Sequence, residues 1–147
     1  MKQYTLAFIF DNNLEKVALI EVTKESWNKG KLNGIGGHIE PNESIINANI
    51  REVGEEFGMY IDRWKYFGKL NDNSNDWEVH LFTTKMDYTL DNYGELHNEE
   101  GIVRIYNIDD IVNTFDEKLM INLNWLIPMA LNTFKCDQPF MKITEQL

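Results

Sequence analysis

Cysteine, long apolar runs and basic residues are all scarce in this chain of 147 residues. Cys136 is the one cysteine, so no disulfide can form within the chain, which is compatible with a reducing compartment. We expect Cys136 to serve as a small buried hydrophobic residue. No stretch approaches the roughly 18 apolar residues that a membrane span needs, and the apolar run at residues 6–10 is too short for a signal peptide. These absences predict a cytoplasmic protein with no membrane contact.

Basic residues are outnumbered by acidic ones, 14 against 24, which gives a formal charge of −10. Such a charge repels a polyanion, so we expect no extended nucleic-acid surface. Bound divalent cations would reverse the field locally, which leaves room for a small phosphate ligand that binds together with a metal. The excess acid is equally consistent with a role in solubility alone.

No repeat, low-complexity tract or Pro/Gly/Ser-rich linker divides the chain, so we expect a single domain over residues 1–147. Apolar runs rich in β-branched and aromatic residues predict strands at residues 5–10, 17–22, 64–70, 77–86 and 103–106. Helical spacing predicts helices at residues 44–57, 109–115 and 119–134, the last kinked or broken at Pro128. This order indicates an α+β fold, or α/β/α layers around a mixed sheet.

The helix predicted at residues 44–57 has clear start and stop signals. Ser44 stands at its beginning, and Gly58 follows it as a residue that readily ends a helix. At 100° per residue its large apolar side chains fall on one stripe about 60° wide, which we expect to face the core. The residues of this stripe are Ile46, Ile50, Val53 and Phe57.

Three glutamates of the same helix, Glu52, Glu55 and Glu56, share a sector of about 100° that lies almost opposite the apolar stripe. Like charges at i,i+4 disfavour a helix by roughly 0.2–0.5 kcal/mol each, and a divalent cation would remove this repulsion. Carboxylate oxygens suit Mg²⁺, with Mn²⁺ as a substitute, whereas Zn²⁺ prefers imidazole and thiolate ligands. The potential zinc ligands, His38, His80, His97 and Cys136, are scattered. Taken alone, the three glutamates are also typical of an ordinary solvated helix face.

A longer pattern surrounds these glutamates. It consists of Gly37, five residues, Glu43, seven residues, and then R-E-V-G-E-E-F-G-M at residues 51–59. A chance match of this length is on the order of 10⁻⁷. The pattern resembles the Nudix box at every required position, and the similarity continues upstream into residues 31–37 and more weakly into residues 98–111.

The resemblance implies a Nudix-type α/β/α sandwich with a mixed central sheet, on which the box forms a loop, a helix and a loop. It places the metal ligands at Glu52, Glu55 and Glu56, with Glu56 as the principal one. It also implies that Gly36 offers a backbone carbonyl to a metal, and that Gly37 allows a tight turn against the helix.

By the same resemblance, Arg51 pairs with Glu43 and braces the loop, although such a pair could equally be a surface contact of little energy. Nudix proteins often add a glutamate from a loop beyond the box, as a further metal ligand or as the base. Glu100 matches that loop best, followed by Glu99.

The resemblance implies a metal-dependent pyrophosphohydrolase, in which a metal-bound water attacks a diphosphate and a glutamate takes the proton. Residues 32–37 are similar to the branch that hydrolyses oxidised purine nucleoside triphosphates to monophosphate and pyrophosphate, where an asparagine at the place of Asn33 contacts the base. Leu32 and His38 stand where many members of that branch carry tryptophan and a basic residue.

Other residues could contact a small-molecule nucleotide. The candidates are Asn33, His38, Trp27, Trp125 and Asp116, with Phe10 and Glu117 as further possibilities. Each also has a structural explanation, because aromatic residues mostly fill cores and charges before a helix commonly cap it.

Several alternatives stay open. The substrate could be an RNA 5′ end, a nucleotide sugar or a dinucleoside polyphosphate, although the negative charge disfavours long RNA. The domain could also be a nucleotide-sensing module without activity. Either a monomer or a homodimer is compatible with the sequence.

Overall fold

The computed structural model describes residues 1–74, 76–87, 90–113, 117–120, 122–135 and 141–145, and Asp116 and Cys136 lie outside these ranges. The elements follow the order β1 (Lys2–Phe10), β2 (Lys16–Val22), β3 (Leu32–Asn33), α1 (Ile45–Phe57), β4 (Lys65–Asp72), β5 (Trp77–Lys85), β6 (Glu95–His97), β7 (Gly101–Asn107), α2 (Ile108–Val112), α3 (Leu123–Lys135) and β8 (Met141–Glu145).

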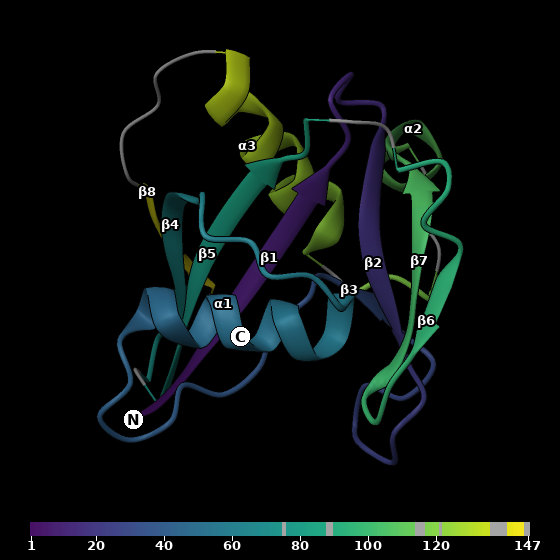
Figure 1. The fold of residues 1–147 in the computed structure, drawn as a ribbon. Helices are drawn as coiled ribbons and strands as arrows, with labels where there is room; N and C mark the ends of the chain where they lie inside the picture. Colours follow the sequence, from purple (N-terminus) through teal and green to yellow (C-terminus); the bar gives the residue numbers. More distant parts are fainter. Residues whose placement is uncertain (75, 88–89, 114–116, 121, 136–140, 146–147) are drawn as a thin grey trace.

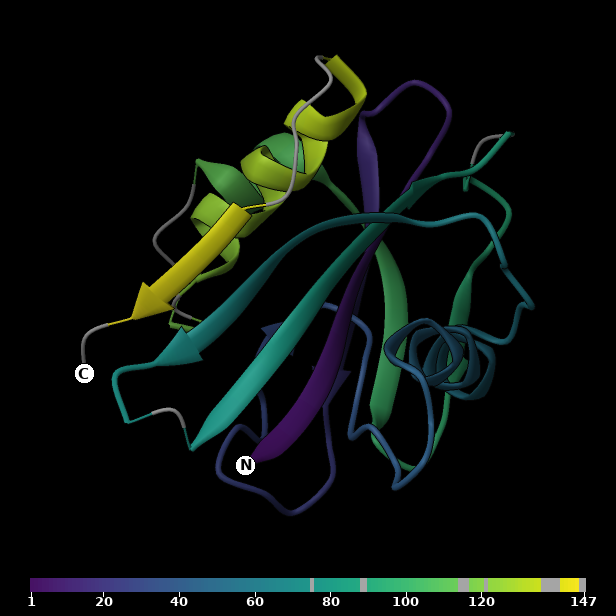
Figure 2. The same ribbon diagram turned by 90° about the vertical axis from the view of Figure 1, so that its left-hand side faces the viewer.

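Within the described ranges the strands form one mixed sheet of eight strands, in the order β6-β7-β2-β1-β5-β4-β8 with β3 beside β2. β1 runs parallel to β5 and β4 parallel to β8, whereas the other pairs are antiparallel. α1 covers one face of the sheet, and α2 and α3 cover the other (Figures 1 and 2). The predicted α+β sandwich is therefore confirmed.

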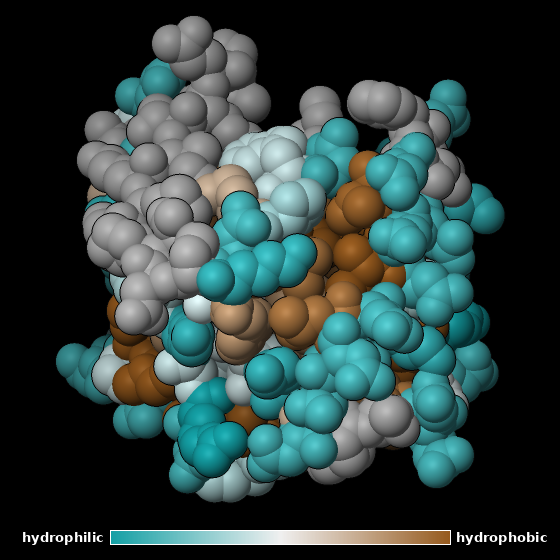
Figure 3. Space-filling view, turned by 90° about the horizontal axis from the view of Figure 1, so that it is seen from above, coloured by the Kyte–Doolittle hydropathy of each residue, from teal (hydrophilic) through white to brown (hydrophobic). Residues whose placement is uncertain are grey.

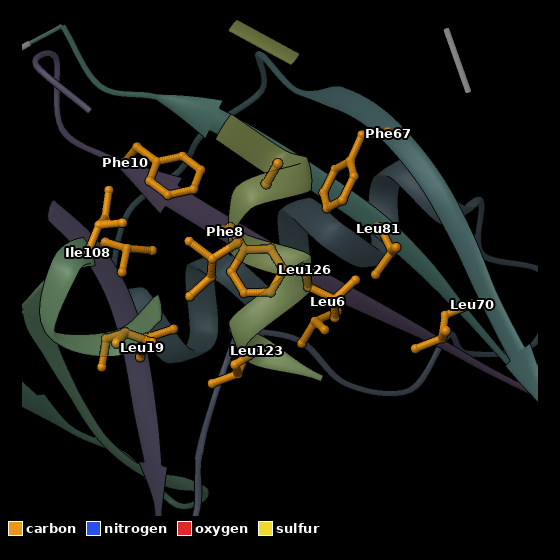
Figure 4. Packing of buried hydrophobic residues seen from close by; sticks show 14 residues of the cluster. Leu6, Phe8, Phe10, Leu19, Phe67, Leu70, Leu81, Ile108, Leu123 and Leu126 are labelled. Carbon is orange, nitrogen blue, oxygen red and sulfur yellow. The ribbon is translucent and has the colours of Figure 1, made fainter. Parts of the chain in front are cut away.

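Strand β1 is apolar on both sides because helices cover both faces of the sheet. Leu6, Phe8 and Phe10 point into the core under α2 and α3 (Figure 4), whereas Ala7 and Ile9 point into the core under α1. Phe10 is fully buried, and its ring meets that of Phe134 at 6.2 Å. The suggestion that Phe10 stacks on a base is therefore wrong, because the core already encloses its ring.

β1 and β2 pair only near the turn that joins them, at Ile9 and Phe10, and then diverge. The segment 35–39 fills the opening and pairs with the free edge of β1: the N–H of Ala7 bonds the carbonyl of Ile35 at 2.7 Å, and that of Thr5 bonds the carbonyl of Gly37 at 2.9 Å. This pairing fixes the entry to the predicted box against the centre of the sheet.

The two ends of helix α1 agree closely with their prediction. The Ser44 side chain caps its start by accepting from the N–H of Asn47 at 3.2 Å, and Gly58 ends it in the left-handed conformation with φ of 83°. These local signals were sufficient to place both ends.

The last helix differs from its prediction at its start and at Pro128. It begins at Leu123 instead of 119, because Leu119 lies beside Leu32 of β3 and the N–H of Met120 bonds the Leu32 carbonyl at 3.0 Å. The helix also continues through Pro128, so of the two predicted outcomes, a kink or a break, the break is wrong. The missing N–H of Pro128 deprives one helical carbonyl, that of Asn124, of its usual partner.

The surface of the upper face is largely hydrophilic, with an apolar strip running between hydrophilic side chains (Figure 3). In the part of the chain that the structure describes, no helix is long and apolar enough to cross a membrane.

Candidate active site

Helix α1 is rotated relative to its prediction, so that two of the three glutamates face inward. Glu52 and Glu56 are only 9% and 4% exposed, whereas the side chain of Glu55 is 59% exposed. The buried residues of α1 are Ala48, Asn49, Glu52, Val53, Glu56 and Phe57. The prediction of three carboxylates on one solvent-side patch is therefore wrong for Glu52 and Glu56.

The physical reason lies in the glycine loop that faces the helix. A Cβ atom on Gly37 would lie 2.6 Å from the carboxylate of Glu52, and one on Gly36 would lie 1.9 Å from the carbonyl oxygen of Thr5. The N–H of Gly36 donates to Oε2 of Glu56 at 3.2 Å. Because Gly36 has no side chain, the loop can lie directly against β1, and because Gly37 has none, the carboxylate of Glu52 has room beside the loop.

Arg51 joins the helix to the loop before it. Its Nε and Nη2 atoms donate to the two carboxylate oxygens of Glu43 at 2.8 and 3.1 Å, and Nη2 also donates to the carbonyl of His38 at 2.9 Å. Its Nη1 atom donates to Glu52 at 2.8 Å and lies 3.5 Å from Glu55. The hydrogen bonds from Arg51 lower the pKa of Glu43. One guanidinium therefore fixes the loop and orients a buried carboxylate.

The buried carboxyl group of Glu56 carries the largest electrostatic cost at this site. Burial, followed by the charge of Glu52, raises the pKa of Glu56 to about 8, against the hydrogen bond from Gly36. Burial also raises the pKa of Glu52, against the hydrogen bond from Arg51. Within the described ranges, no Lys or Arg side chain forms an ion pair with Glu56. A buried carboxylate of this kind calls for a cation that the described side chains do not supply.

The turn between β6 and β7 brings Glu100 to the same region. After burial, the charge of Glu100 contributes to raising the pKa of both Glu52 and Glu56. The carbonyl of Glu100 accepts from the N–H groups of Thr23 and Lys24 at 3.1 and 3.3 Å, and its carboxylate pairs with Lys24 Nζ at 3.1 Å. Glu99 is exposed.

The donors gathered here are hard oxygens, which fit a divalent cation such as Mg²⁺ or Mn²⁺. As the side chains are placed, no three His, Cys, Asp or Glu side chains among the described residues converge closely enough to share one ion. Arg51 holds Glu52 and Lys24 holds Glu100, so these carboxylates must move if they are to share one ion.

The predicted nucleotide contacts have diverse surroundings. Asn33 is half-buried on β3, and its Oδ1 accepts from the N–H of Gly34 at 2.8 Å. The ring of His38 packs against that of Tyr4, with centroids 4.5 Å apart.

The two tryptophans among the predicted nucleotide contacts lie in different environments. Trp27 is 85% exposed on the loop between β2 and β3, the same loop whose Lys24 holds Glu100. Trp125 is half-buried on α3 and packs against the core on that side of the sheet. Asp116 lies outside the described residues, and the carbonyl of Glu117 accepts from Lys31 Nζ.

A concave site of about 300 Å³ lies on the face of the sheet opposite α1. Its lining residues are Glu21, Gly30, Leu32, Tyr106, Asp110, Ile111, Lys118 and Leu119. Sequence analysis did not identify it, because it depends on Leu32 meeting Leu119 across 87 positions of the chain. The N–H of Gly30 bonds the carbonyl of Val22 at 2.7 Å, and the next residue, Thr23, bonds the carbonyl of Glu100. Residues 21–23 therefore connect the cavity, which Glu21 lines, to the turn that carries Glu100.

Comparison with known proteins is informative at the level of family and fold. Residues 2–123 match the model of the NUDIX domain. A search of curated protein sequences gave no match.

Three solved structures illustrate the similarity of fold. A MutT protein from Methanosarcina mazei Go1 is 21% identical, with a TM-score of 0.69 over 92% of this chain and 96% of that one. An ADP-ribose pyrophosphatase from Streptococcus suis 89-1591 is 16% identical, with a TM-score of 0.68 over 97% of this chain and 98% of that one. The NUDIX domain of Shewanella oneidensis NrtR, solved with ADP ribose, is 17% identical, with a TM-score of 0.69 over 90% of this chain and 87% of that one.

Proposed function

Because the chain belongs to the NUDIX family and is a pyrophosphohydrolase, we propose that it hydrolyses purine nucleoside triphosphates, normal or oxidised in the base, to the monophosphate and pyrophosphate. We further propose that Mg²⁺, with Mn²⁺ as a substitute, is held by Glu52, Glu55 and Glu56, with Glu100 and the carbonyl of Gly36 as additional ligands.

The single observation that carries this proposal is the buried carboxyl group of Glu56. It is 4% exposed, its pKa is raised to about 8 by burial and by the charge of Glu52, and its hydrogen-bond partner is the uncharged N–H of Gly36. Keeping such a group without a cation costs folding free energy, so its presence is best explained by a ligand of opposite charge.

Divalent cations, when bound, would lower the pKa of a water molecule and neutralise charge on the diphosphate. The protein's own groups have distinct tasks. Arg51 hydrogen-bonds the carboxylate of Glu52 and opposes the rise in its pKa that burial causes. In the glycine loop, Gly37 leaves space for the carboxylate of Glu52, and the N–H of Gly36 donates to that of Glu56. In the reaction, a water oxygen bonds to one phosphorus while the bond from that phosphorus to the bridging oxygen breaks. The released proton passes to one of the two more exposed carboxylates, Glu55 or Glu100.

Support for a nucleoside triphosphate comes from the residues around the glycine loop. Asn33 offers an amide that can read a purine edge, and it stands two residues before Ile35, where the loop joins β1. The exposed ring of Trp27 lies on the loop that binds Glu100, so it is available for stacking beside the phosphate site. We propose His38 and Trp125 as weaker contacts, and the net charge of −10 disfavours a long RNA.

A nucleoside diphosphate linked to a sugar is the second candidate. Two structures of the same fold are those of an ADP-ribose pyrophosphatase and of a NUDIX domain in complex with ADP ribose. If this chain shares such a substrate, the diphosphate lies at the same glutamates and only the groups on either side differ.

A panel of substrates distinguishes the two proposals. Purified protein would be assayed with Mg²⁺ and with Mn²⁺ on normal and oxidised purine triphosphates, ADP-ribose, other nucleotide sugars, dinucleoside polyphosphates and capped RNA, with Glu56→Gln as the inactive control. We expect a purine triphosphate to exceed the others in kcat/KM by about tenfold, a margin of about 1.4 kcal/mol. A clear preference for ADP-ribose would favour the second candidate, and hydrolysis of none would reject both.

A further inference from the structure

One side-chain amide, that of Asn98, organises the turn between β6 and β7. Its Oδ1 accepts from the backbone N–H groups of Glu100 at 2.9 Å and Gly101 at 3.0 Å. The backbone N–H of Asn98 donates to the carbonyl of Gly101 at 2.9 Å. These bonds set the backbone conformation at Glu100. The direction of the Glu100 side chain therefore depends on Asn98.

The other end of the same amide reaches helix α1. Nδ2 of Asn98 donates to the backbone carbonyl of Glu56 at 3.0 Å, across 42 positions of the chain. The carbonyls of the last helical turn have no partner within the helix, so this carbonyl is free to accept from outside it. Asn98 thus contacts the backbone of Glu56 with one atom and the backbone of Glu100 with another.

We propose that Asn98 is a positioning residue, which sets the separation between Glu56 and Glu100 so that both carboxylates can bind the same divalent cations. This inference rests on the proposed function, because it takes these two glutamates as metal ligands. The turn is also held from the opposite side, since the carbonyl of Glu100 accepts from the N–H groups of Thr23 and Lys24. Asn98 supplies the remaining restraint, the one directed at the helix.

A side-chain amide meets both requirements at once, because its oxygen accepts and its nitrogen donates. The turn needs an acceptor for two N–H groups, and the carbonyl of Glu56 needs a donor. An aspartate at position 98 keeps the acceptor but has no donor, and its charge would repel the carbonyl oxygen. Asn98→Asp therefore separates the link to the helix from the structure of the turn.

A purely structural role for Asn98 predicts a different outcome, and the chain contains a matched control. The hydroxyl of Tyr93 donates to the carbonyl of Phe57 at 2.7 Å, one residue beyond Glu56 in the same helical turn. Tyr93→Phe removes a hydrogen bond of the same kind from the same end of α1 without touching the turn at Glu100. If Asn98 only stabilised the end of the helix, Tyr93→Phe and Asn98→Asp would have equal effects.

The test measures Mn²⁺ binding by electron paramagnetic resonance in the absence of substrate, on the whole chain and on the variants Asn98→Asp, Asn98→Ala and Tyr93→Phe. Residues that orient metal ligands typically alter affinity by about 10–100-fold when mutated. We expect both Asn98 variants to weaken Mn²⁺ binding by at least about tenfold, and Tyr93→Phe to change it less than about twofold. The charge added by Asn98→Asp would by itself favour a cation, so a loss in this variant cannot be an effect of charge.

Kinetics and a double variant give independent readouts. We expect kcat to fall by about tenfold or more in Asn98→Asp with little change in the KM for the nucleotide, because the diphosphate contacts remain. In a Glu100→Gln background, Asn98→Asp should have a much smaller effect on Mn²⁺ binding, since the two residues act through one site. Thermal unfolding checks that each variant is folded. If Asn98→Ala does not fold, Asn98→Asp, which preserves the turn, still tests the proposal.

Two results would overturn the proposal: Mn²⁺ binding by Asn98→Asp equal to that of the unmodified chain, or an equal loss in Tyr93→Phe. Either result leaves the proposed function intact if the unmodified chain binds Mn²⁺ and hydrolyses a diphosphate. If the unmodified chain does neither, the proposed function itself has failed, and this inference fails with it.

Discussion

Replacing Glu56 with glutamine should stabilise the metal-free protein at alkaline pH. Glutamine has nearly the shape of glutamate but carries no charge, so it removes the cost of an ionised carboxylate that is 4% exposed. The folded protein holds a proton on Glu56 up to a pKa of about 8, whereas the unfolded chain releases it near the ordinary value of 4.5. Between these two values the folded state binds the additional proton, so the free energy of unfolding falls as the pH rises.

The magnitude follows from the difference between the two pKa values. At about 1.4 kcal/mol for each pH unit, the interval from 4.5 to about 8 corresponds to roughly 5 kcal/mol. Local relaxation and water entry reduce this figure, so we expect about 2 to 5 kcal/mol. The stability advantage of Glu56→Gln should be near zero at pH 4.5 and approach this full value above pH 8.

The assay is urea unfolding at several pH values between 5 and 9, in EDTA and again with Mn²⁺. Comparing the variant with the unmodified chain cancels the titration of groups that both share. Glu55→Gln is the matched control, because the side chain of Glu55 is 59% exposed and loses little hydration on folding. Mn²⁺ should remove the alkaline loss of stability in the unmodified chain and have little effect on Glu56→Gln. A constant difference between the two proteins from pH 5 to 9 would refute the reasoning.

Three further predictions concern the loop, its brace and the competition between proton and metal. Gly37→Ala places a methyl group against the carboxylate of Glu52 and should reduce kcat for the best substrate by about tenfold or more. An unchanged kcat would contradict this prediction. Arg51→Lys keeps the charge but loses the bidentate contact with Glu43. It should lower the free energy of unfolding in urea by about 1–3 kcal/mol. A loss below about 0.5 kcal/mol would show that the pair is an ordinary surface contact. Below pH 8, the affinity for Mn²⁺ should increase by up to about tenfold for each unit of increasing pH, because the cation must displace the proton of Glu56. Titration calorimetry measures this affinity, and an affinity that does not depend on pH would count against the displacement.

Gly54→Ala is the control for the glycine prediction. A Cβ at this position would meet only the carbonyl oxygen of Met59, at 4.0 Å, so the substitution is free of clashes. Alanine is the better helix former by about 1 kcal/mol, and Gly54→Ala should therefore be active and somewhat more stable. A loss of activity equal to that of Gly37→Ala would mean that the loop effect is not specific.

Features with local causes could be predicted from the sequence. Ser44 and Gly58 mark the ends of α1 because their contacts lie within a few residues of them. The resemblance to the Nudix box implied the pairing of Glu43 with Arg51 that the structure contains. The mixed sheet with helices on both faces also followed from the order of the elements.

Features that depend on distant segments could not be predicted in this way. The inward rotation of Glu52 and Glu56 requires the space beside Gly37, and a periodic apolar stripe does not reveal that space. The link from Asn98 to Glu56 spans 42 residues, and the last helix starts later than predicted because Leu119 pairs with Leu32. Strand β8 also depends on its pairing with β4. In each case the determining contact lies outside the window in which periodicity and capping can be read.

The most direct measurement is anomalous diffraction from crystals grown with Mn²⁺, recorded for the unmodified chain and for Glu56→Gln. The proposed site predicts a Mn²⁺ peak within about 2.5 Å of carboxylate oxygens of Glu52 and Glu56 in the unmodified chain, and a weaker peak or none in the variant. A clear Mn²⁺ peak elsewhere on the protein, with neither carboxylate in contact, would contradict the central claim.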